Sequence, residues 1–64
     1  MKRKELIRQL TEAGCVLYRH GARHDVYINP VSGKKQPVPR HIEIHNKLAK
    51  HIKKQLGLLL EKIE

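Results

Sequence analysis

Residues 21–40 read GARHDVYINPVSGKKQPVPR and carry the clearest structural pattern of the chain. HDVYIN (24–29) alternates aliphatic residues with residues of other kinds, as a β-strand with two different faces does. QPVPR (36–40) has prolines at alternate positions, so N–H donors are lost along only one edge of a strand. NPVSGKK (29–35), between them, has the asparagine, proline and glycine of a turn. The sequence therefore predicts an antiparallel hairpin whose second strand lies at the edge of a sheet.

The segments before the hairpin predict one helix and one further strand. In KRKELIRQLTEAG (2–14), apolar residues recur at helical spacing and a glycine follows, which is the pattern of an amphipathic helix and its stop. CVLYR (15–19) is rich in residues that favour strands. HGAR (20–23) then supplies a turn. The apolar set of the helix is Leu6, Ile7, Leu10 and Ala13.

HIEIHNKLAKHIKKQLG (41–57) predicts a second helix. Asn46 is the expected N-cap, and Gly57 is the expected stop. Lysines dominate the outer surface of this helix. The last residues, LLLEKIE (58–64), are more apolar than a free tail should be, so we expect them to pack on the domain or on a partner. The expected apolar face of the helix is Leu48, Ala49, Ile52 and Leu56.

The elements follow in the order helix, three strands, helix. With both helices on one face of a three-stranded antiparallel sheet, this is a two-layer α+β domain. A chain of 64 residues lies near the lower size limit for independent folding. We therefore expect one domain over residues 1–64, with a core of about 2–58 and a short tail of 59–64.

The alternation also predicts which side of the sheet each side chain faces. We expect Val26 and Ile28 to face the helices, with Tyr18 and Tyr27 on the opposite face. His24 has the parity of Val26 and Ile28. Because it is the first residue of the strand, we expect it where the core face opens to solvent.

The formal net charge of +8, from 14 Lys and Arg against 6 Asp and Glu, indicates a polyanionic partner. Nucleic acid is the default candidate. An acidic protein partner, or a basic surface that only keeps the domain soluble, stays open at this point.

We expect a cytoplasmic protein with no membrane segment. The single cysteine, Cys15, rules out an intrachain disulfide and fits a reducing compartment. The opening MKRKELIRQL lacks the apolar run of a secretory signal. No stretch approaches the roughly 20 apolar residues that span a bilayer.

His24 is the candidate catalytic residue. It borders the turn at Gly21, is flanked by Arg23, and lies near Lys34 and Lys35 in the sequence. Histidine gives and takes protons near neutral pH, so beside cations that hold a phosphate it could remove the 2′-OH proton of RNA. A turn histidine that only binds phosphate is the equally supported alternative. The candidates to hold phosphates or RNA are Arg23, Lys34, Lys35, Arg40 and Tyr27.

No metal or cofactor is expected. The pair His20 and His24 straddles a glycine turn, and no cysteine or carboxylate pattern completes a site with it or with His41 and His45. We interpret His20, His41, His45 and His51 as solvent-exposed.

The chain resembles the HicA family of bacterial toxins, small messenger-RNA interferases of type II toxin–antitoxin systems. The resemblance covers about residues 2–58 and is clearest where His24 stands three residues before Tyr27, with VPRH following. The matching segments, in order, are KELIRQLTEAGCVLYR (4–19), HGARHDVYINP (20–30), VPRH (38–41) and LAKHIKKQLGL (48–58).

The resemblance implies a fold like that of double-stranded-RNA-binding domains, with His24 as the catalytic residue of a nuclease. It also implies cleavage of messenger RNA that inhibits translation and growth, and a HicB-type antitoxin that covers the site. The chain departs from the commonest family form, Gly-Ser-His, because Ala22 and Arg23 stand between Gly21 and His24.

Besides a domain that binds an acidic protein partner, the sequence therefore leaves two functions from different classes. The first is a metal-independent endoribonuclease, in which Tyr27, a lysine or His24 itself protonates the leaving oxygen. The second is a non-catalytic, small basic RNA-binding module, whose charge and fold would be the same.

Overall fold

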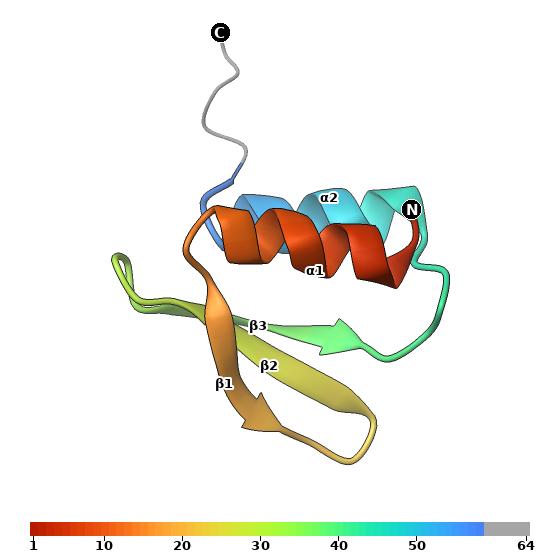
Figure 1. Ribbon diagram of the computed structural model, residues 1–64, viewed down its shortest axis with the longest axis horizontal. Helices are drawn as coiled ribbons and strands as arrows, with labels where there is room; N and C mark the ends of the chain where they lie inside the picture. The colour runs from red at the N-terminus through yellow and green to blue at the C-terminus, as the bar shows by residue number, and fades with distance from the viewer. Residues whose placement is uncertain (59–64) are drawn as a thin grey trace, which may run out of the picture.

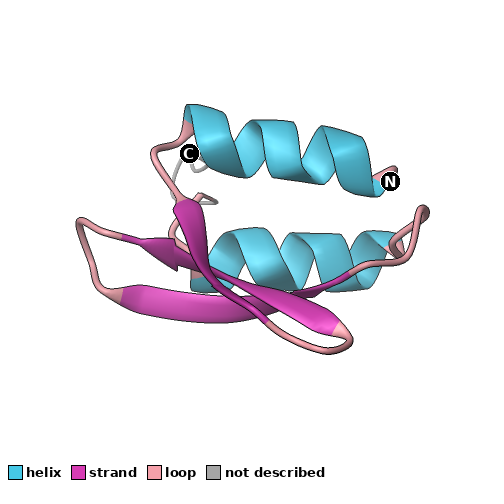
Figure 2. Ribbon diagram, turned by 60° about the horizontal axis from the view of Figure 1, so that its bottom comes forward, coloured by secondary structure: helices cyan, strands magenta, loops and turns pink. Residues whose placement is uncertain are grey.

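Five elements follow one another over residues 1–58, which the computed structural model describes (Figure 1). They are α1 (Arg3–Glu12), β1 (Val16–His20), β2 (His24–Asn29), β3 (Lys34–Pro39) and α2 (Asn46–Gln55). Figure 2 shows the two helices together on one face of the antiparallel sheet, which confirms the predicted α+β architecture. The predicted tail of 59–64 lies outside the described residues, and none of the helices described is long and apolar enough to cross a membrane.

β2 is the central strand, and β3 is an edge strand as predicted. In the register of β2 with β3, His24 lies opposite Pro39 and Asn29 lies opposite Lys34. β1 pairs with the other side of β2 and contains one bulge. The bounds of β2 match the predicted ones, and those of β1 and β3 differ from them by one or two residues.

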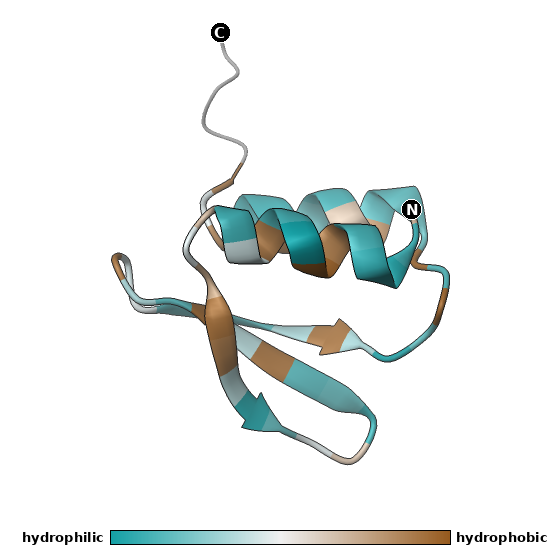
Figure 3. Ribbon diagram, viewed as in Figure 1, coloured by the Kyte–Doolittle hydropathy of each residue, from teal (hydrophilic) through white to brown (hydrophobic). Residues whose placement is uncertain are grey.

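One apolar core lies between the helices and the sheet, where Figure 3 shows the apolar sides of the helices. From the first helix, Leu6 and Leu10 are buried, Ile7 is half-buried, and Ala13 is exposed. The segment 58–64 was expected to pack on the domain or on a partner, and its one described residue, Leu58, contacts the core of the domain. The buried core residues are Leu6, Leu10, Cys15, Val38, Ile44, Ala49, Ile52 and Leu56.

The predicted apolar face of α2 is buried except for Leu48. Ala49 and Ile52 are buried, and so is Leu56 just after the helix, whereas Leu48 remains 40% exposed. Spacings of three and four residues align side chains best at 3.6 residues per turn. The set Ala49, Ile52 and Leu56 follows that spacing. Leu48 is therefore left at the margin of the core.

The predicted assignment of the two sheet faces was wrong for β2, whereas Tyr18 of β1 is exposed on the open face as predicted. Asp25 is buried at 8% exposure, and Tyr27 packs against the core. Residues opposite each other in an antiparallel pair share a face, and Asp25 lies opposite the core residue Val38. Asp25 and Tyr27 thus face the helices, whereas Val26, with the parity of His24, faces the open side. The reason is electrostatic, because cationic side chains on the helix side hold the Asp25 carboxylate there.

The connection from β3 to α2 is bonded to the start of the chain. The Met1 amino group donates to the carbonyl oxygen of Ile44 at 3.0 Å and to Oδ1 of Asn46 at 2.8 Å. The N-cap is His45, whose Nδ1 accepts from the backbone N–H of Lys47 at 3.1 Å. The prediction of Asn46 as N-cap was therefore wrong by one residue, because its side-chain oxygen serves the amino group of Met1.

Truncating Ile52 should cost far more stability than truncating Leu48. We expect Ile52→Ala to lower the free energy of unfolding by about 2–5 kcal/mol, because it opens a cavity in the core. Leu48→Ala should cost about 1 kcal/mol or less, since its side chain is partly in water. Urea denaturation followed by circular dichroism measures both. Equal losses would mean that the face of α2 described above is not the buried one.

Candidate active site

His24 is the first residue of β2 and directly follows residues 21–23, which join β1 to β2. Figure 1 shows this connection at the end of the sheet that projects away from the helices. The turn is closed by the backbone N–H of Gly21, which donates to the carbonyl oxygen of His24 at 2.9 Å. A Cβ atom at Gly21 would lie 2.5 Å from that oxygen, so the close approach requires glycine. The His24 side chain is exposed, and no side-chain hydrogen bond within residues 1–58 involves its imidazole.

The neighbouring residue, Asp25, is the centre of an ion cluster on the helix side of the sheet. Its Oδ1 accepts from Nε and Nη2 of Arg40 at 3.0 and 2.9 Å. Its Oδ2 accepts from Nη2 of Arg3 at 2.8 Å, and Nδ1 of His20 lies 2.8 Å from Oδ1. The hydrogen bonds from Arg40 hold the pKa of Asp25 below its ordinary value, with nearby positive charges acting in the same direction and burial opposing them.

Arg40 also reaches the turn itself. Its Nη1 donates to the carbonyl oxygen of Ala22 at 2.9 Å, and its Nη2 donates to that of Gly21. Its Nη2 further lies 3.1 and 3.3 Å from the two ring nitrogens of His20. One guanidinium thus joins the buried carboxylate of Asp25 to the backbone of the turn.

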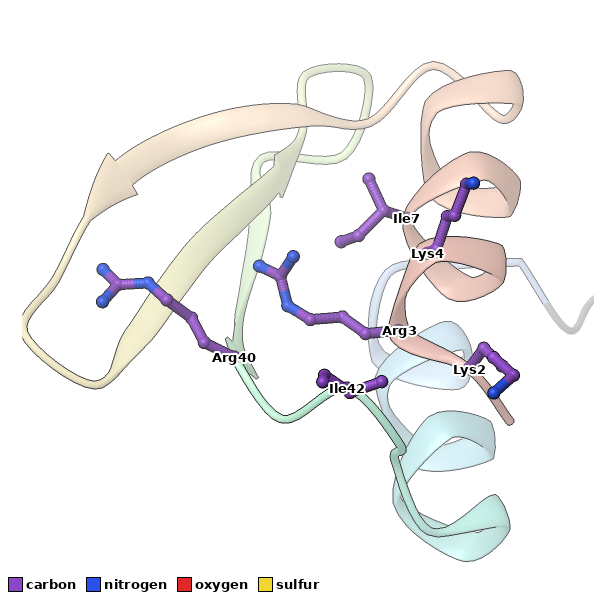
Figure 4. Close-up of a pocket in the computed structure, with 6 residues that line it drawn as sticks. All are labelled: Lys2, Arg3, Lys4, Ile7, Arg40 and Ile42. Carbon is purple, nitrogen blue, oxygen red and sulfur yellow. The ribbon is translucent and has the colours of Figure 1, made fainter.

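A basic groove lies on the other side of the cluster, between the start of α1 and the segment after β3 (Figure 4). Its volume is about 510 Å³, and four of its six lining residues are cations. Figure 4 shows Arg3 and Arg40 reaching towards the sheet, where both bond Asp25. The ion cluster therefore separates this groove from the turn of His24. The lining residues are Lys2, Arg3, Lys4, Ile7, Arg40 and Ile42.

The structure brings only some of the predicted site residues together. Arg23 is in the turn beside His24, and Arg40 follows Pro39, the register partner of His24. Lys34 instead pairs with Asn29, at the other end of the hairpin. Five residue steps along a strand amount to about 17 Å. The two lysines therefore lie near the opposite turn from the histidine.

The side chains of two predicted RNA contacts, Tyr27 and Lys35, make contacts within the protein. Tyr27 packs against the core on the helix side, so its side chain is directed away from the open face. The Nζ of Lys35 lies 4.4 Å from the centroid of the Tyr18 ring, on the open face, in a cation–π contact.

The sequence did not indicate the ion cluster, although it singled out Arg40 as a candidate phosphate contact. By its parity with Tyr27, Asp25 was expected on the sheet face away from the helices, and its partner Arg3 was counted only in the net charge. His20 is exposed, as predicted, but it contacts Asp25. The available signal was a lone carboxylate beside the candidate histidine in a strongly basic chain. Within residues 1–58, no group of three His, Cys, Asp or Glu side chains is arranged to hold a metal ion.

The fold and the site together define a class of protein. It is a small basic α+β domain with an α-β-β-β-α fold like that of double-stranded-RNA-binding domains. A histidine begins its second strand, directly after a turn that Arg40 holds by hydrogen bonds. The chain belongs to the HicA toxin family, because the model of that family, described as "HicA toxin of bacterial toxin-antitoxin", matches residues 3–58. No curated protein and no solved structure matches the chain. Family membership makes the protein a toxin of a toxin–antitoxin system, a class that acts with an antitoxin partner.

The turn should loosen in acid before the core does. The pKa of Asp25 is lowered by folding, so its stabilising contribution is present above the unfolded-state value of about 3.9 and is lost as the pH falls through the folded-state value. In an NMR titration, we expect the amide resonances of residues 21–24 to shift below about pH 3.9, before those of Ile52. Asp25→Asn should lack this transition. A turn that changes only when the whole domain unfolds would contradict the assignment.

Proposed function

We propose that the protein is a metal-independent endoribonuclease that cleaves messenger RNA, with His24 as its general base. As a toxin of a type II system in the cytoplasm, it would inhibit translation and growth until a HicB-type antitoxin covers the site. The observation that carries the proposal is the exposed imidazole of His24 on a turn that is fixed from below by a buried ion cluster. Membership in the HicA toxin family supports it.

In the proposed reaction, His24 removes the proton of a ribose 2′-OH. The 2′-oxygen attacks the adjacent phosphorus, and the bond from phosphorus to the 5′-oxygen breaks. The products are a 2′,3′-cyclic phosphate and a 5′-hydroxyl, whose proton comes from His24 acting a second time or from a lysine. Tyr27 packs against the core, so its hydroxyl is not the proposed proton donor to the 5′-oxygen. One positioned proton-transfer group contributes about 10²–10⁴-fold, which indicates a slow enzyme.

The charge distribution supports RNA as the substrate. A-form RNA is recognised mostly through its shape, its phosphates and its 2′-hydroxyls, and the net charge of +8 supplies the attraction. Arg23 is the cation next to His24 in the turn and is the proposed contact to the reacting phosphate. Lys34 and Lys35 are the proposed contacts to backbone phosphates further along the strand.

Replacing His24 should abolish cleavage without affecting the fold. We expect His24→Ala to lose at least about 10²-fold in the single-turnover rate, because it removes the proposed base. Its stability should stay within about 0.5 kcal/mol of wild type, since the side chain is exposed. The variant should not inhibit growth when expressed alone, but it should still bind RNA and should still copurify with the antitoxin.

The matched control is His51→Ala, which removes an exposed histidine from α2. It should cleave at the wild-type rate and remain toxic. Wild-type cleavage should also persist in EDTA and should leave DNA intact, because the nucleophile is the 2′-OH of the RNA. A toxic His24→Ala variant would leave the non-catalytic binding module as the better function. Wild-type cleavage that EDTA abolishes would instead overturn the metal-independent mechanism.

Replacing both hairpin lysines should weaken binding and leave the chemistry unchanged. We expect Lys34→Ala with Lys35→Ala to raise the dissociation constant for RNA and to make its salt dependence shallower by up to about two phosphate contacts. At saturating RNA the cleavage rate should match wild type, because the lysines lie at the other end of the hairpin from His24. Fluorescence anisotropy at several salt concentrations, with single-turnover rates, measures this. A lower rate at saturation would place the lysines at the reacting phosphate instead.

A further inference from the structure

The ion cluster lies directly below the proposed base. His24 and Asp25 are neighbours in β2, so their side chains leave the strand on opposite faces. The Asp25 carboxylate, on the helix side, is held by Arg3 from α1. Nε of Arg3 also donates to the carbonyl oxygen of Pro39 at 2.8 Å. Pro39 lies opposite His24 in the sheet, so these bonds attach both strands at this point to the helix layer.

The turn that carries the base has little else to fix it. Within the turn, one backbone hydrogen bond is made, from Gly21 to His24. Gly21 and Ala22 have no side-chain groups that could hydrogen-bond, and Arg23 is exposed. The carbonyl oxygens of Gly21 and Ala22 are both bonded by Arg40. The same guanidinium is therefore the main connection between the turn and the rest of the domain.

Arg40 is also poorly available to an incoming phosphate. Its side chain is 33% exposed, and each of its three nitrogens already donates to an acceptor of the protein. Only a planar guanidinium offers donors in directions that suit a carboxylate and two carbonyl groups at once. A lysine would keep the charge but would place its donors on one nitrogen.

We propose that Arg40 is a positioning residue, which fixes the direction of the His24 imidazole by joining Asp25 to the carbonyl groups of the turn. The proposal deepens the proposed function and rests on it. It replaces the expectation that Arg40 holds a phosphate of the RNA. Removing Arg40 should therefore lower the rate of the chemical step more than the affinity for RNA.

The test compares Arg40→Lys with Arg40→Gln in single-turnover cleavage. A displacement of about 1 Å can cost about 10²-fold in rate, so we expect both variants to be slower by roughly 10–100-fold at saturating RNA. The dissociation constant should stay within about threefold of wild type. A phosphate-binding role predicts a different pattern, in which lysine restores function, and glutamine weakens binding and lowers the salt slope by about one.

Arg8→Lys and Arg8→Gln are the matched controls. Arg8 also bonds two carboxylates, those of Glu5 and Glu12, but does so on the surface of α1. Both control variants should cleave at the wild-type rate, so they measure the general effect of losing one charge or one ion pair. Cleavage at the wild-type rate by Arg40→Lys would overturn the proposal.

Amide hydrogen exchange tests the positioning without using activity. In Arg40→Lys, the amide of Gly21 should exchange faster than in wild type, while that of Ile52 in the core keeps its protection. If Arg40→Lys does not fold, Asp25→Asn serves instead, since it keeps a side-chain oxygen and removes the charge. Unchanged exchange at Gly21 would overturn the positioning role. Faster exchange at Gly21 together with an active His24→Ala variant would instead overturn the proposed function. In that case Arg40 would still be shown to fix the turn.

Discussion

The carboxylate of Asp25 is the constraint on which the arrangement of the site depends. Among residues 1–58, it is the one charged side chain that the fold buries. Arg3 from α1 and Arg40 after β3 both donate to it, and His20 of β1 contacts it. A buried carboxylate has to be paired and hydrogen-bonded, so the sheet, the first helix and the turn are held to one another where it lies. The proposed base is the next residue in the chain.

Local pattern was sufficient to predict the elements and their order. The helical spacing of Leu6 and Leu10, the alternation of HDVYIN and the prolines of the edge strand each depend on residues close in sequence. The face of the sheet could not be predicted in the same way, because β2 carries Val26 and Ile28 on one side and Tyr27 on the other. The ion cluster determines which of these two sides faces the helices. Its contacts join residues 15 and 22 positions apart, which periodicity does not report.

The residues of the candidate site could be predicted only where local sequence pattern indicates them. His24 follows from its chemistry, its place beside a turn and its match to the HicA pattern, all of which are local. Lys34 and Lys35 were grouped with His24 because they are near it in sequence. They lie beside the turn between β2 and β3, however, whereas His24 is at the other end of this hairpin. For Arg40, the sequence identified a residue that does lie near His24 but suggested the wrong partner, a phosphate. Its actual partners are Asp25 and two backbone carbonyl groups.

Chemical rescue tests most directly whether an imidazole at position 24 transfers the proton. His24→Ala should be incubated with RNA in EDTA while the concentration of added imidazole is increased. The account predicts that the cleavage rate rises with imidazole and that the wild-type bond is cut, because the free base can occupy the space of the missing side chain. Cleavage by His24→Ala that equals wild type without imidazole, or that imidazole leaves unchanged at every concentration, would contradict it.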